Sequence, residues 1–450
     1  MSTLQIVAVA LTVCLNALDG FDVLSISFAS PGIASEWGID RAQLGIVLSM
    51  ELIGMAIGSI LLGNVADRIG RRPTILGCLT VMVFGMYLAT TAKGLVVLSM
   101  WRVITGLGIG GMLAAINAVA AEFANARRKH LSVALMTIGY PLGGVVGGLL
   151  ASKLLQTYDW RSVFYLGSCL TAIMVPLVYF LIPESVHWQT RKQPAGALEN
   201  INKTLRRMGH QVIAALPHVS ADARKQSSGD VFGSTLIATT IIVTAAYFFH
   251  IMTFYFILKW VPKIVADLGF APSAAGNVLV WVNAGGALGG AIFGFLTLKY
   301  DVKALTVGVF VLSSMAVAVF GYSLFGEPPE DLQMLSFICL CAGFCTNAGI
   351  VGMYALFAHA FPTHARAFGT GFAIGIGRGG SVLAPIIAGF LFESGIPVPV
   401  VAMIMAIGSL VGAIVLLFLK INPEHEQPVG ATAGSAGNQS TASAPRAAAA

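Results

Sequence analysis

The stretch "GNVADRIGRRP", residues 63–73, lies between two long apolar runs and holds four charged side chains within eleven residues. The apolar runs on either side, at about 43–66 and 74–93, are each near the roughly 20 residues that a helix needs to cross a bilayer. Loops rich in Lys and Arg stay on the cytoplasmic side of a membrane. The stretch therefore predicts a cytoplasmic connection between two membrane-spanning helices.

The composition of the whole chain is typical of a protein whose solvent is lipid. Of its 450 residues, 56% are apolar and only 10% are charged, and the mean hydropathy is +0.83. Soluble domains have roughly 25% charged residues. The net charge of +6 does not indicate nucleic-acid binding, because Lys and Arg gather in short segments between apolar runs. The six cysteines lie inside those runs without metal-ligand neighbours, so no metal site is expected.

Twelve apolar runs of suitable length predict an all-α polytopic membrane protein with twelve transmembrane helices. Their approximate limits are 5–30, 43–66, 74–93, 95–121, 131–156, 162–183, 232–260, 273–297, 304–325, 332–358, 367–393 and 397–420. A polar segment at 184–231 divides them into an N-terminal bundle, 1–183, and a C-terminal bundle, 232–420. We expect this segment to be a cytoplasmic linker and the Ala/Gly/Ser-rich tail at 421–450 to be disordered.

Lys and Arg residues are distributed unequally between the two sides of this arrangement. Eighteen fall on the side of the two termini and six on the opposite side, while Arg102 and Arg378 fall inside spans. Because cytoplasmic loops carry an excess of Lys and Arg, we expect both termini and the central linker in the cytoplasm. This orientation suits a multi-pass protein of the cell's inner membrane.

The two halves resemble each other in sequence. Residues 122–144 align with 359–381, and the alignment matches Phe123 with Phe361, Arg128 with Arg366 and Gly139 with Gly377. Two parallel repeats of six spans with a long linker are typical of secondary transporters whose site lies between the halves. A pseudo-symmetric arrangement of six plus six helices is therefore expected.

The first span contains two acids within "ALDGFDVLSISFASP", residues 17–31. Asp19 and Asp22 are three residues apart and share one face of a helix. An unpaired charge in a bilayer costs several kcal/mol, so such acids indicate a functional site. Burial and mutual repulsion favour holding a proton on at least one of the acids, and the pattern leaves open which one. Gly20 is expected to keep this helix narrow and to leave room for a ligand.

Two intramembrane arginines complete the predicted set of buried charges. Arg102 can pair with the acids or sense their protonation, and the guanidinium of Arg378 fits a substrate carboxylate through two parallel hydrogen bonds. A structural alternative is that Asp19–Arg102 and Asp22–Arg378 are ion pairs that hold the two halves together. Glu51 lies in the second span near the outer surface, where we expect it to be hydrated.

The loop at 63–73 resembles the cytoplasmic signature G-x-x-x-D-R-x-G-R-R of the major facilitator superfamily. The resemblance implies the major facilitator fold and assigns a cytoplasmic gate motif to Gly63, Asp67, Arg68, Gly70, Arg71 and Arg72. Gly63 is expected to permit close helix packing, while Asp67 pairs with basic groups. The corresponding loop at 294–303 has lost the motif, with Leu298 where the acid would stand, so any latch is expected to depend on the first half.

The D-G-F-D sequence of the first span resembles the aromatic acid:H+ symporter family within that superfamily. The other segments similar to this family are 27–39, 101–111, 160–164, 183–185 and 361–385. The resemblance implies a transporter, not an enzyme, that imports benzoate-type, hydroxybenzoate-type or phenylpropanoate-type acids together with protons. The proton gradient would be its driving force, without a cofactor, and a monomer is expected.

An aromatic acid requires a ring pocket as well as charged groups. We expect proton coupling at Asp19, Asp22 and Arg102. The predicted substrate-binding residues are Arg378, His250, Tyr140, Tyr354 and Trp281. For each aromatic residue, a simple packing role facing lipid or the core is the competing interpretation, and His250 is as consistent with a buried packing histidine as with a ligand or proton relay.

Other functions remain open at this stage. The segment "GYPLGGVVGG", residues 139–148, faintly resembles the fifth-span signature of drug:proton antiporters, but its proline spacing differs. A symporter of another organic acid or of a sugar is a further alternative. A membrane receptor that binds without transport is disfavoured, because neither the linker nor the tail resembles a signalling domain. The absence of a Walker A sequence argues against an ATP-driven pump.

Overall fold

The computed structural model describes residues 1–125, 128–217, 232–233, 236–325, 331–361 and 366–420. The predicted disordered tail at 421–450 lies outside the described residues, as does the part of the predicted linker at 218–231.

The described residues contain twelve helices that are long and apolar enough to cross a membrane, which confirms the predicted number. In the N-terminal half they are α1 (Thr3–Trp37), α2 (Arg41–Ile69), α3 (Arg71–Ala89), α4 (Leu95–Phe123), α5 (Lys129–Leu154) and α6 (Arg161–Leu181). In the C-terminal half they are α9 (Ile237–Asp267), α10 (Pro272–Leu296), α11 (Val302–Tyr322), α12 (Leu332–Ala360), α13 (Arg366–Glu393) and α14 (Val398–Leu417). Two shorter helices, α7 (Val186–Lys192) and α8 (Ala197–Met208), follow α6.

Local sequence signals account for several helix ends. Ser2 and Gln5 form a capping box that begins α1, and the Asp40 side chain accepts a 2.6 Å hydrogen bond from the Gln43 amide at the start of α2. Two helices end seven residues later than predicted: α1 at Trp37 rather than near residue 30, and α9 at Asp267 rather than near residue 260. Lys259, in the last turn of the predicted span, therefore lies well inside α9.

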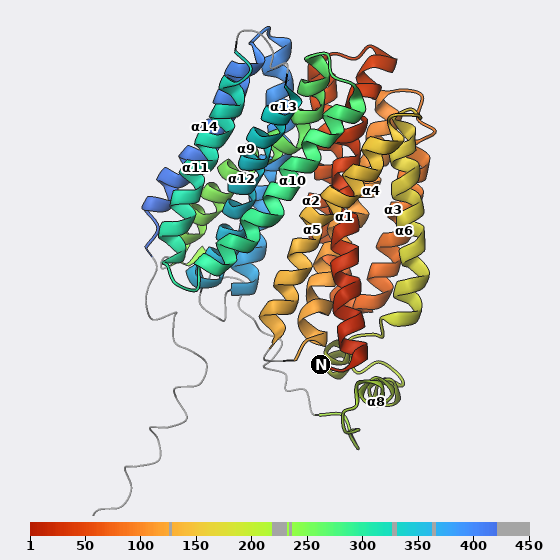
Figure 1. Cartoon of the computed structure of the whole chain (residues 1–450). Helices are drawn as coiled ribbons and strands as arrows, with labels where there is room; N and C mark the ends of the chain where they lie inside the picture. The colour runs from red at the N-terminus through yellow and green to blue at the C-terminus, as the bar shows by residue number, and fades with distance from the viewer. Residues whose placement is uncertain (126–127, 218–231, 234–235, 326–330, 362–365, 421–450) are drawn as a thin grey trace, which may run out of the picture.

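The two halves repeat the same pattern of helix packing. In the N-terminal half α1 packs on α5, α2 on α4 and α3 on α6. In the C-terminal half the equivalent pairs are α9 with α13, α10 with α12 and α11 with α14. Figure 1 shows the two bundles side by side. The pattern agrees with the six-plus-six repeat expected from the sequence.

Glycines allow close contact at matching places in the two halves. A β-carbon at Gly54 would collide with the backbone carbonyl of Val103, so this glycine brings α2 against α4. A β-carbon at Gly285 would likewise collide with the carbonyl of Leu340, which lets α10 approach α12. Such contacts replace the hydrophobic driving force that helices lack in lipid.

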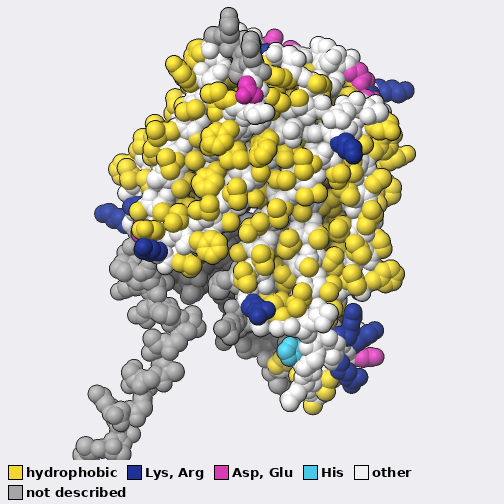
Figure 2. Space-filling model, in the orientation of Figure 1, with side chains coloured by type: hydrophobic (Ala, Val, Ile, Leu, Met, Phe, Trp, Pro, Cys, Tyr) yellow, Lys and Arg dark blue, Asp and Glu magenta, His cyan; other side chains and the backbone are white. Residues whose placement is uncertain are grey.

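The surface of the bundle is apolar between its two ends. Figure 2 shows hydrophobic side chains across most of the visible face, with Lys, Arg, Asp and Glu mainly toward the ends. We call the end where α1 begins and α8 lies the linker end, and the opposite one the far end (Figure 1). Together with the twelve spans, this surface identifies a multi-pass membrane protein.

The two halves meet mainly through α2 with α13, α5 with α10 and α1 with α9. Toward the far end, Ser49 of α2 donates a 2.7 Å hydrogen bond to the carbonyl of Val382 on α13. Arg41 and Asp267 form an ion pair of 3.0 Å across the same end. These contacts join the halves where α2 begins.

Candidate functional site

The two acids of α1 are buried in the middle of the helix. Asp19 is 1% exposed and Asp22 is fully buried. Between them, Gly20 lies so close to α5 that a β-carbon would collide with the backbone carbonyl of Tyr140. The expectation that Gly20 leaves room for a ligand was therefore wrong, because that room is filled by the α5 backbone.

Asp22 is directed into the N-terminal half. Its Oδ2 atom accepts a long hydrogen bond of 3.5 Å from Thr171 on α6, and a β-carbon at Gly167 would lie 3.0 Å from its Oδ1 atom. Arg102 donates a 2.9 Å hydrogen bond to the backbone carbonyl of Asp22 rather than to its carboxylate. The contacts of Asp22 are thus to helices of its own half.

Asp19 faces a charge from the other half. It lies close enough to Arg378, on α13, for the two charges to interact. Among the described residues, neither carboxylate oxygen of Asp19 has a hydrogen-bond partner, nor does the Nη1 atom of Arg378, although all three atoms are buried. We call Asp19 and Arg378 the open pair. Its unused hydrogen-bonding capacity is costly in a low-dielectric interior, and binding a proton or an anion would reduce that cost.

Tyrosines surround the open pair. The hydroxyls of Tyr247 on α9 and Tyr354 on α12 lie 3.4 Å apart, and both Tyr247 and Tyr255 lie within electrostatic reach of Arg378. The hydroxyl of Tyr140 is buried beside Tyr255 and lies within electrostatic reach of Asp19. The structure thus brings Tyr140, Tyr354 and Arg378 together, as the sequence predicted, and adds Tyr247 and Tyr255.

A second group of charges is paired. Glu51 on α2 forms an ion pair with Arg102 on α4, and Lys259 on α9 lies 3.8 Å from the other Glu51 oxygen. Lys259 also donates a hydrogen bond to the backbone carbonyl of Val23, which crosses from the C-terminal to the N-terminal half. All three side chains are fully buried. We call Glu51, Arg102 and Lys259 the paired cluster.

The paired cluster corrects three interpretations of the sequence. Glu51 is not exposed to water, because it is fully buried in an ion pair with Arg102 of α4. The structural alternative that paired Asp19 with Arg102 fails, since Arg102 instead bonds to Glu51 and to the Asp22 backbone. Lys259 was missed because its span was predicted to end at residue 260. Its charge in the last turn of a predicted span could have indicated a buried functional group.

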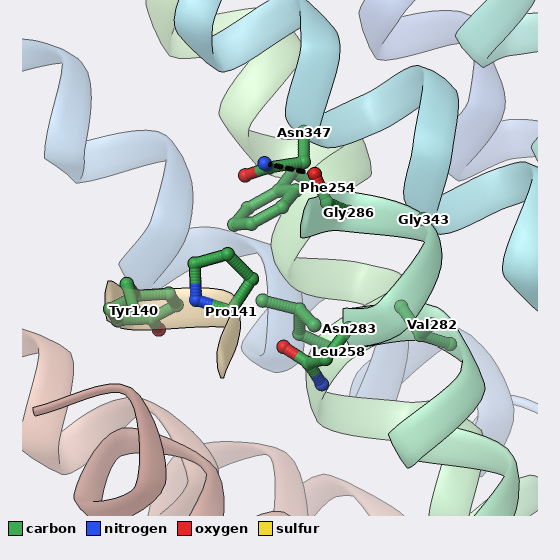
Figure 3. Close-up of a pocket in the computed structure, with 9 residues that line it drawn as sticks. All are labelled: Tyr140, Pro141, Phe254, Leu258, Val282, Asn283, Gly286, Gly343 and Asn347. Atoms are coloured by element: carbon green, nitrogen blue, oxygen red, sulfur yellow. Dashed lines mark hydrogen bonds between the residues drawn. The ribbon is translucent and has the colours of Figure 1, made fainter. Parts of the chain in front are cut away.

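A narrow pocket lies between the halves. Figure 3 shows Tyr140 and Pro141 of α5 on one side and residues of the C-terminal half on the other. The remaining lining residues are Phe254, Leu258, Val282, Asn283, Gly286, Gly343 and Asn347. Because Tyr140 also neighbours Asp19, the pocket lies beside the open pair. Neither asparagine was predicted as a site residue from the sequence, although each is a polar residue inside a span.

The structure does not bring His250 and Trp281 to this interface. His250 is fully buried, its two ring nitrogens lie 2.9 Å from the Ser409 hydroxyl and the Thr346 carbonyl, and its ring stacks on Phe310 at 3.9 Å. Trp281 is 45% exposed on the outer surface of α10. The geometry therefore agrees with the packing interpretation of both side chains.

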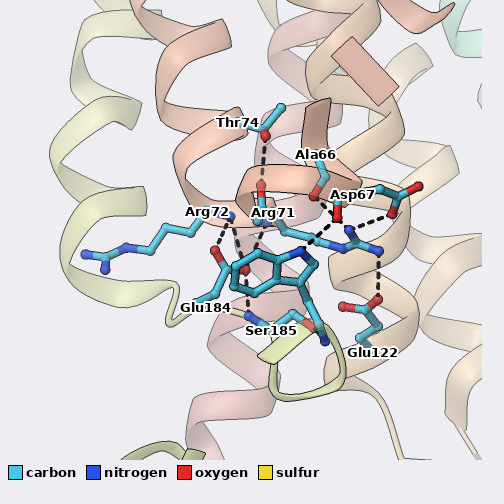
Figure 4. A network of polar contacts seen from close by, with 10 residues as sticks. Ala66, Asp67, Arg71, Arg72, Thr74, Glu122, Glu184 and Ser185 are labelled. Carbon is cyan, nitrogen blue, oxygen red and sulfur yellow. Dashed lines mark hydrogen bonds and ion pairs between the residues drawn. The ribbon is translucent and has the colours of Figure 1, made fainter. Parts of the chain in front are cut away.

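The loop at 63–73 forms a network at the linker end (Figure 4). Arg71 forms ion pairs with Asp67 at 2.8 Å and with Glu122 of α4 at 3.5 Å. The Glu184 carboxylate accepts hydrogen bonds from the backbone amides of Arg71, at 2.9 Å, and Arg72, at 3.2 Å, at the start of α3. Burial raises the pKa of Glu184, and these amide bonds oppose that rise.

The three other residues of the motif have simpler surroundings. Gly70 adopts φ of 113°, a conformation that favours glycine, where α2 turns into α3. A β-carbon at Gly63 would find only an ordinary contact of 3.7 Å to Ala114, so Gly63 is not required for close packing here, contrary to expectation. Arg68 is exposed.

Comparison with known proteins identifies relatives with this architecture. The family model of the Major Facilitator Superfamily matches residues 12–260 and 243–448. The 4-hydroxybenzoate transporter PcaK of Pseudomonas putida is 31% identical over 376 residues, which cover 81% of each chain. The benzoate transport protein of Acinetobacter baylyi is 26% identical and covers 86% of this chain and 84% of its own.

A solved structure confirms the fold. The inward-open xylose transporter XylE from E. coli superposes with a TM-score of 0.73, covers 92% of this chain and 96% of its own, and is 16% identical. With the family model matching both halves, the predicted fold and family are confirmed. The protein therefore belongs to the Major Facilitator Superfamily, as a transporter rather than an enzyme, and has aromatic-acid transporters among its relatives.

Proposed function

We propose that this protein imports a small aromatic carboxylate together with a proton across the cell's inner membrane. The observation that carries the proposal is the open pair: an acid and an arginine from opposite halves, both with unused hydrogen-bonding capacity among the described residues, with tyrosines nearby and a pocket lined by both halves. Sites between the two halves are where such transporters bind their substrates. The relatives named for 4-hydroxybenzoate and benzoate support the same substrate class.

Arg378 is the proposed partner of the substrate carboxylate. Its planar guanidinium can donate two parallel hydrogen bonds to a carboxylate, and its Nη1 atom is free to do so. The neighbouring tyrosines offer hydroxyl donors and ring faces, and Phe254 lines the pocket with a further ring. An aromatic acid would thereby bury its ring against apolar surface while its charge meets Arg378.

Charge balance supports the coupling to protons. The middle of the helices holds three acids and three basic residues: Asp19, Asp22, Glu51, Arg102, Lys259 and Arg378. Binding an anionic carboxylate would leave one excess negative charge in a low-dielectric interior, which is costly. One proton on an acid restores neutrality. Asp19 is the proposed carrier, because its carboxylate oxygens make no competing hydrogen bond.

Alternating access is the proposed mechanism. The far-end contacts between α2 and α13 would open and reform as the halves rock about the site. The excess of Lys and Arg at the linker end supports a cytoplasmic location for that end and for both termini. In this proposal a monomer suffices, and the proton gradient drives transport without a cofactor.

Uptake of labelled 4-hydroxybenzoate and benzoate into proteoliposomes tests the proposal. An acid exterior should drive accumulation above equilibrium, and an uncoupler should abolish it. Net export under the same gradient would support an antiporter instead. Saturable binding without flux would support a receptor, and either result would overturn the proposal.

A further inference from the structure

We propose that the pocket selects aromatic acids whose ring carries a hydroxyl group, and that the amide oxygens of Asn283 and Asn347 accept the hydrogen bond from that hydroxyl. The inference rests on the proposed function for the carboxylate, and it adds a specificity site at the other end of the ring. It is carried by the orientation of two amides that line one pocket (Figure 3).

The orientation of both amides is fixed by their own half. Asn347 on α12 donates through Nδ2 to the Gly286 carbonyl at 2.7 Å, and Asn283 on α10 donates through Nδ2 to the Leu279 carbonyl at 2.9 Å. A carbonyl can only accept, so the NH2 group must face it in each case. Both amides therefore turn their oxygen away from these bonds, as Figure 3 shows for Asn347.

The polar character of the pocket follows from these orientations. Its side chains other than Tyr140 and the two asparagines are apolar, among them Pro141, Phe254 and Leu258. The asparagine oxygens are thus hydrogen-bond acceptors in a pocket whose other side chains are mostly apolar and can contact a ring. A hydroxyl on the ring is a donor that satisfies such an acceptor, whereas a carboxylate would be repelled by it. The carboxylate is thereby directed toward Arg378.

The pocket lies in the interface between the two halves. Asn283 reaches the N-terminal half, because a β-carbon at Gly144 on α5 would collide with its amide. Tyr140 belongs to the pocket and also neighbours Asp19. A single-ring acid can therefore contact both halves at once.

The first test compares ligands in the unmodified protein. Inhibition of labelled benzoate uptake is measured for benzoate, 4-hydroxybenzoate, 3-hydroxybenzoate and 4-methoxybenzoate. We expect at least one hydroxybenzoate to bind about tenfold more tightly than benzoate and than 4-methoxybenzoate, because only a hydroxyl donates to the pocket. Equal affinity for hydroxylated and unhydroxylated acids would overturn the inference while leaving the proposed function intact.

The second test uses Asn347→Leu and Asn283→Leu, which keep similar volume and remove the acceptor. Each variant should lose most of the tenfold preference for the hydroxylated ring, while benzoate affinity changes by less than about threefold. Asn117→Leu is the matched control, because Asn117 makes the same 2.9 Å bond to the carbonyl four residues earlier but is exposed outside the pocket. If a variant loses affinity for benzoate and for the hydroxybenzoate equally, the replaced asparagine has a structural role, and the inference is contradicted.

If neither acid is transported by the unmodified protein, the proposed function itself fails. If both are transported and their relative affinity does not depend on Asn283 or Asn347, only the specificity inference fails. Benzoate uptake by each variant reports whether it is folded and inserted. The ligand comparison in the unmodified protein decides the inference even where a variant does not fold.

Discussion

The paired cluster and the open pair are both groups of buried charges, but only the first is joined by ion pairs. In the paired cluster, Glu51 is bonded to Arg102 and approached by Lys259, which also crosses to the Val23 carbonyl. In the open pair, Asp19 and Arg378 face each other across the interface without using their buried carboxylate oxygens or Nη1 atom. The difference indicates that one group holds the far end of the interface together, while the other can exchange partners during transport.

The physical basis of this difference is the cost of an unpaired charge in a low-dielectric interior. Removing one partner from a buried ion pair costs about 3–5 kcal/mol, so a paired group resists rearrangement. A charge without a bonded partner gains more from binding a proton or an anion. Three predictions test this distinction, from the largest expected effect to the smallest.

Replacing Asp19 with Asn should have the largest effect. Asn keeps the size of the side chain but cannot carry a proton, so accumulation of labelled substrate should fall to equilibrium. Exchange of internal for external substrate should persist, because it requires no net proton movement. Asp22→Asn is the matched comparison and should cause a smaller loss, since the hydrogen bonds of Asp22 among the described residues are to its own half. Full accumulation by Asp19→Asn would remove Asp19 as the carrier.

Replacing Arg378 with Ala should weaken the apparent affinity for the aromatic acid by roughly 10- to 100-fold, because a charge-assisted pair of hydrogen bonds is lost. Arg378→Lys should restore part of the affinity, since it keeps the charge but not the planar fork. Affinity is obtained from initial uptake rates at varied substrate concentration, and immunodetection in membranes controls for expression. An unchanged apparent affinity in Arg378→Ala would exclude Arg378 from the site.

Replacing Lys259 with Met should alter the far end rather than the substrate site. The change removes the charged link between the halves, while Glu51 keeps its ion pair with Arg102. Ser152 is a suitable reporter, because its hydroxyl has no partner and lies where α5 meets Gly276 of α10. In a Ser152→Cys background, a membrane-impermeant maleimide applied from the far end should react several-fold faster when Lys259 is Met.

Lys263→Met is the matched control for that experiment. Lys263 lies one turn after Lys259 on α9 and forms an ion pair with Asp267 of the same helix. Exposed pairs of this type contribute about 0–1 kcal/mol, so its loss should leave the maleimide reaction unchanged. Equal reaction rates for the Lys259 and Lys263 variants would show that the paired cluster does not hold the halves together.

The fold was predictable because it depends on patterns repeated along the chain. Twelve apolar runs, the loop at 63–73 and the alignment of Phe123 with Phe361 determine the number and arrangement of helices. Tyr140, Tyr354 and Arg378 could be proposed because polar groups in spans are costly and therefore informative. These predictions can be made without knowing which face each helix turns toward its neighbours.

The remaining parts of the site depend on that rotation. The chain alone does not reveal that Gly20 faces the α5 backbone, or that His250 faces Ser409 instead of the other half. Lys259 was predicted in the last turn of its span because the end of α9 was predicted seven residues too early. Helix ends and helix faces are set by tertiary packing, which hydropathy does not encode.

In the proposed mechanism, one proton accompanies each aromatic anion because the buried charges must stay balanced. The most direct test measures the pH of a weakly buffered exterior and the uptake of labelled substrate in the same proteoliposomes. We predict that one proton enters per anion and that uptake does not depend on the membrane potential. Substrate uptake without proton movement would contradict this one-to-one coupling. An uptake rate that depends on the membrane potential, with a proton-to-anion ratio other than one, would contradict it as well.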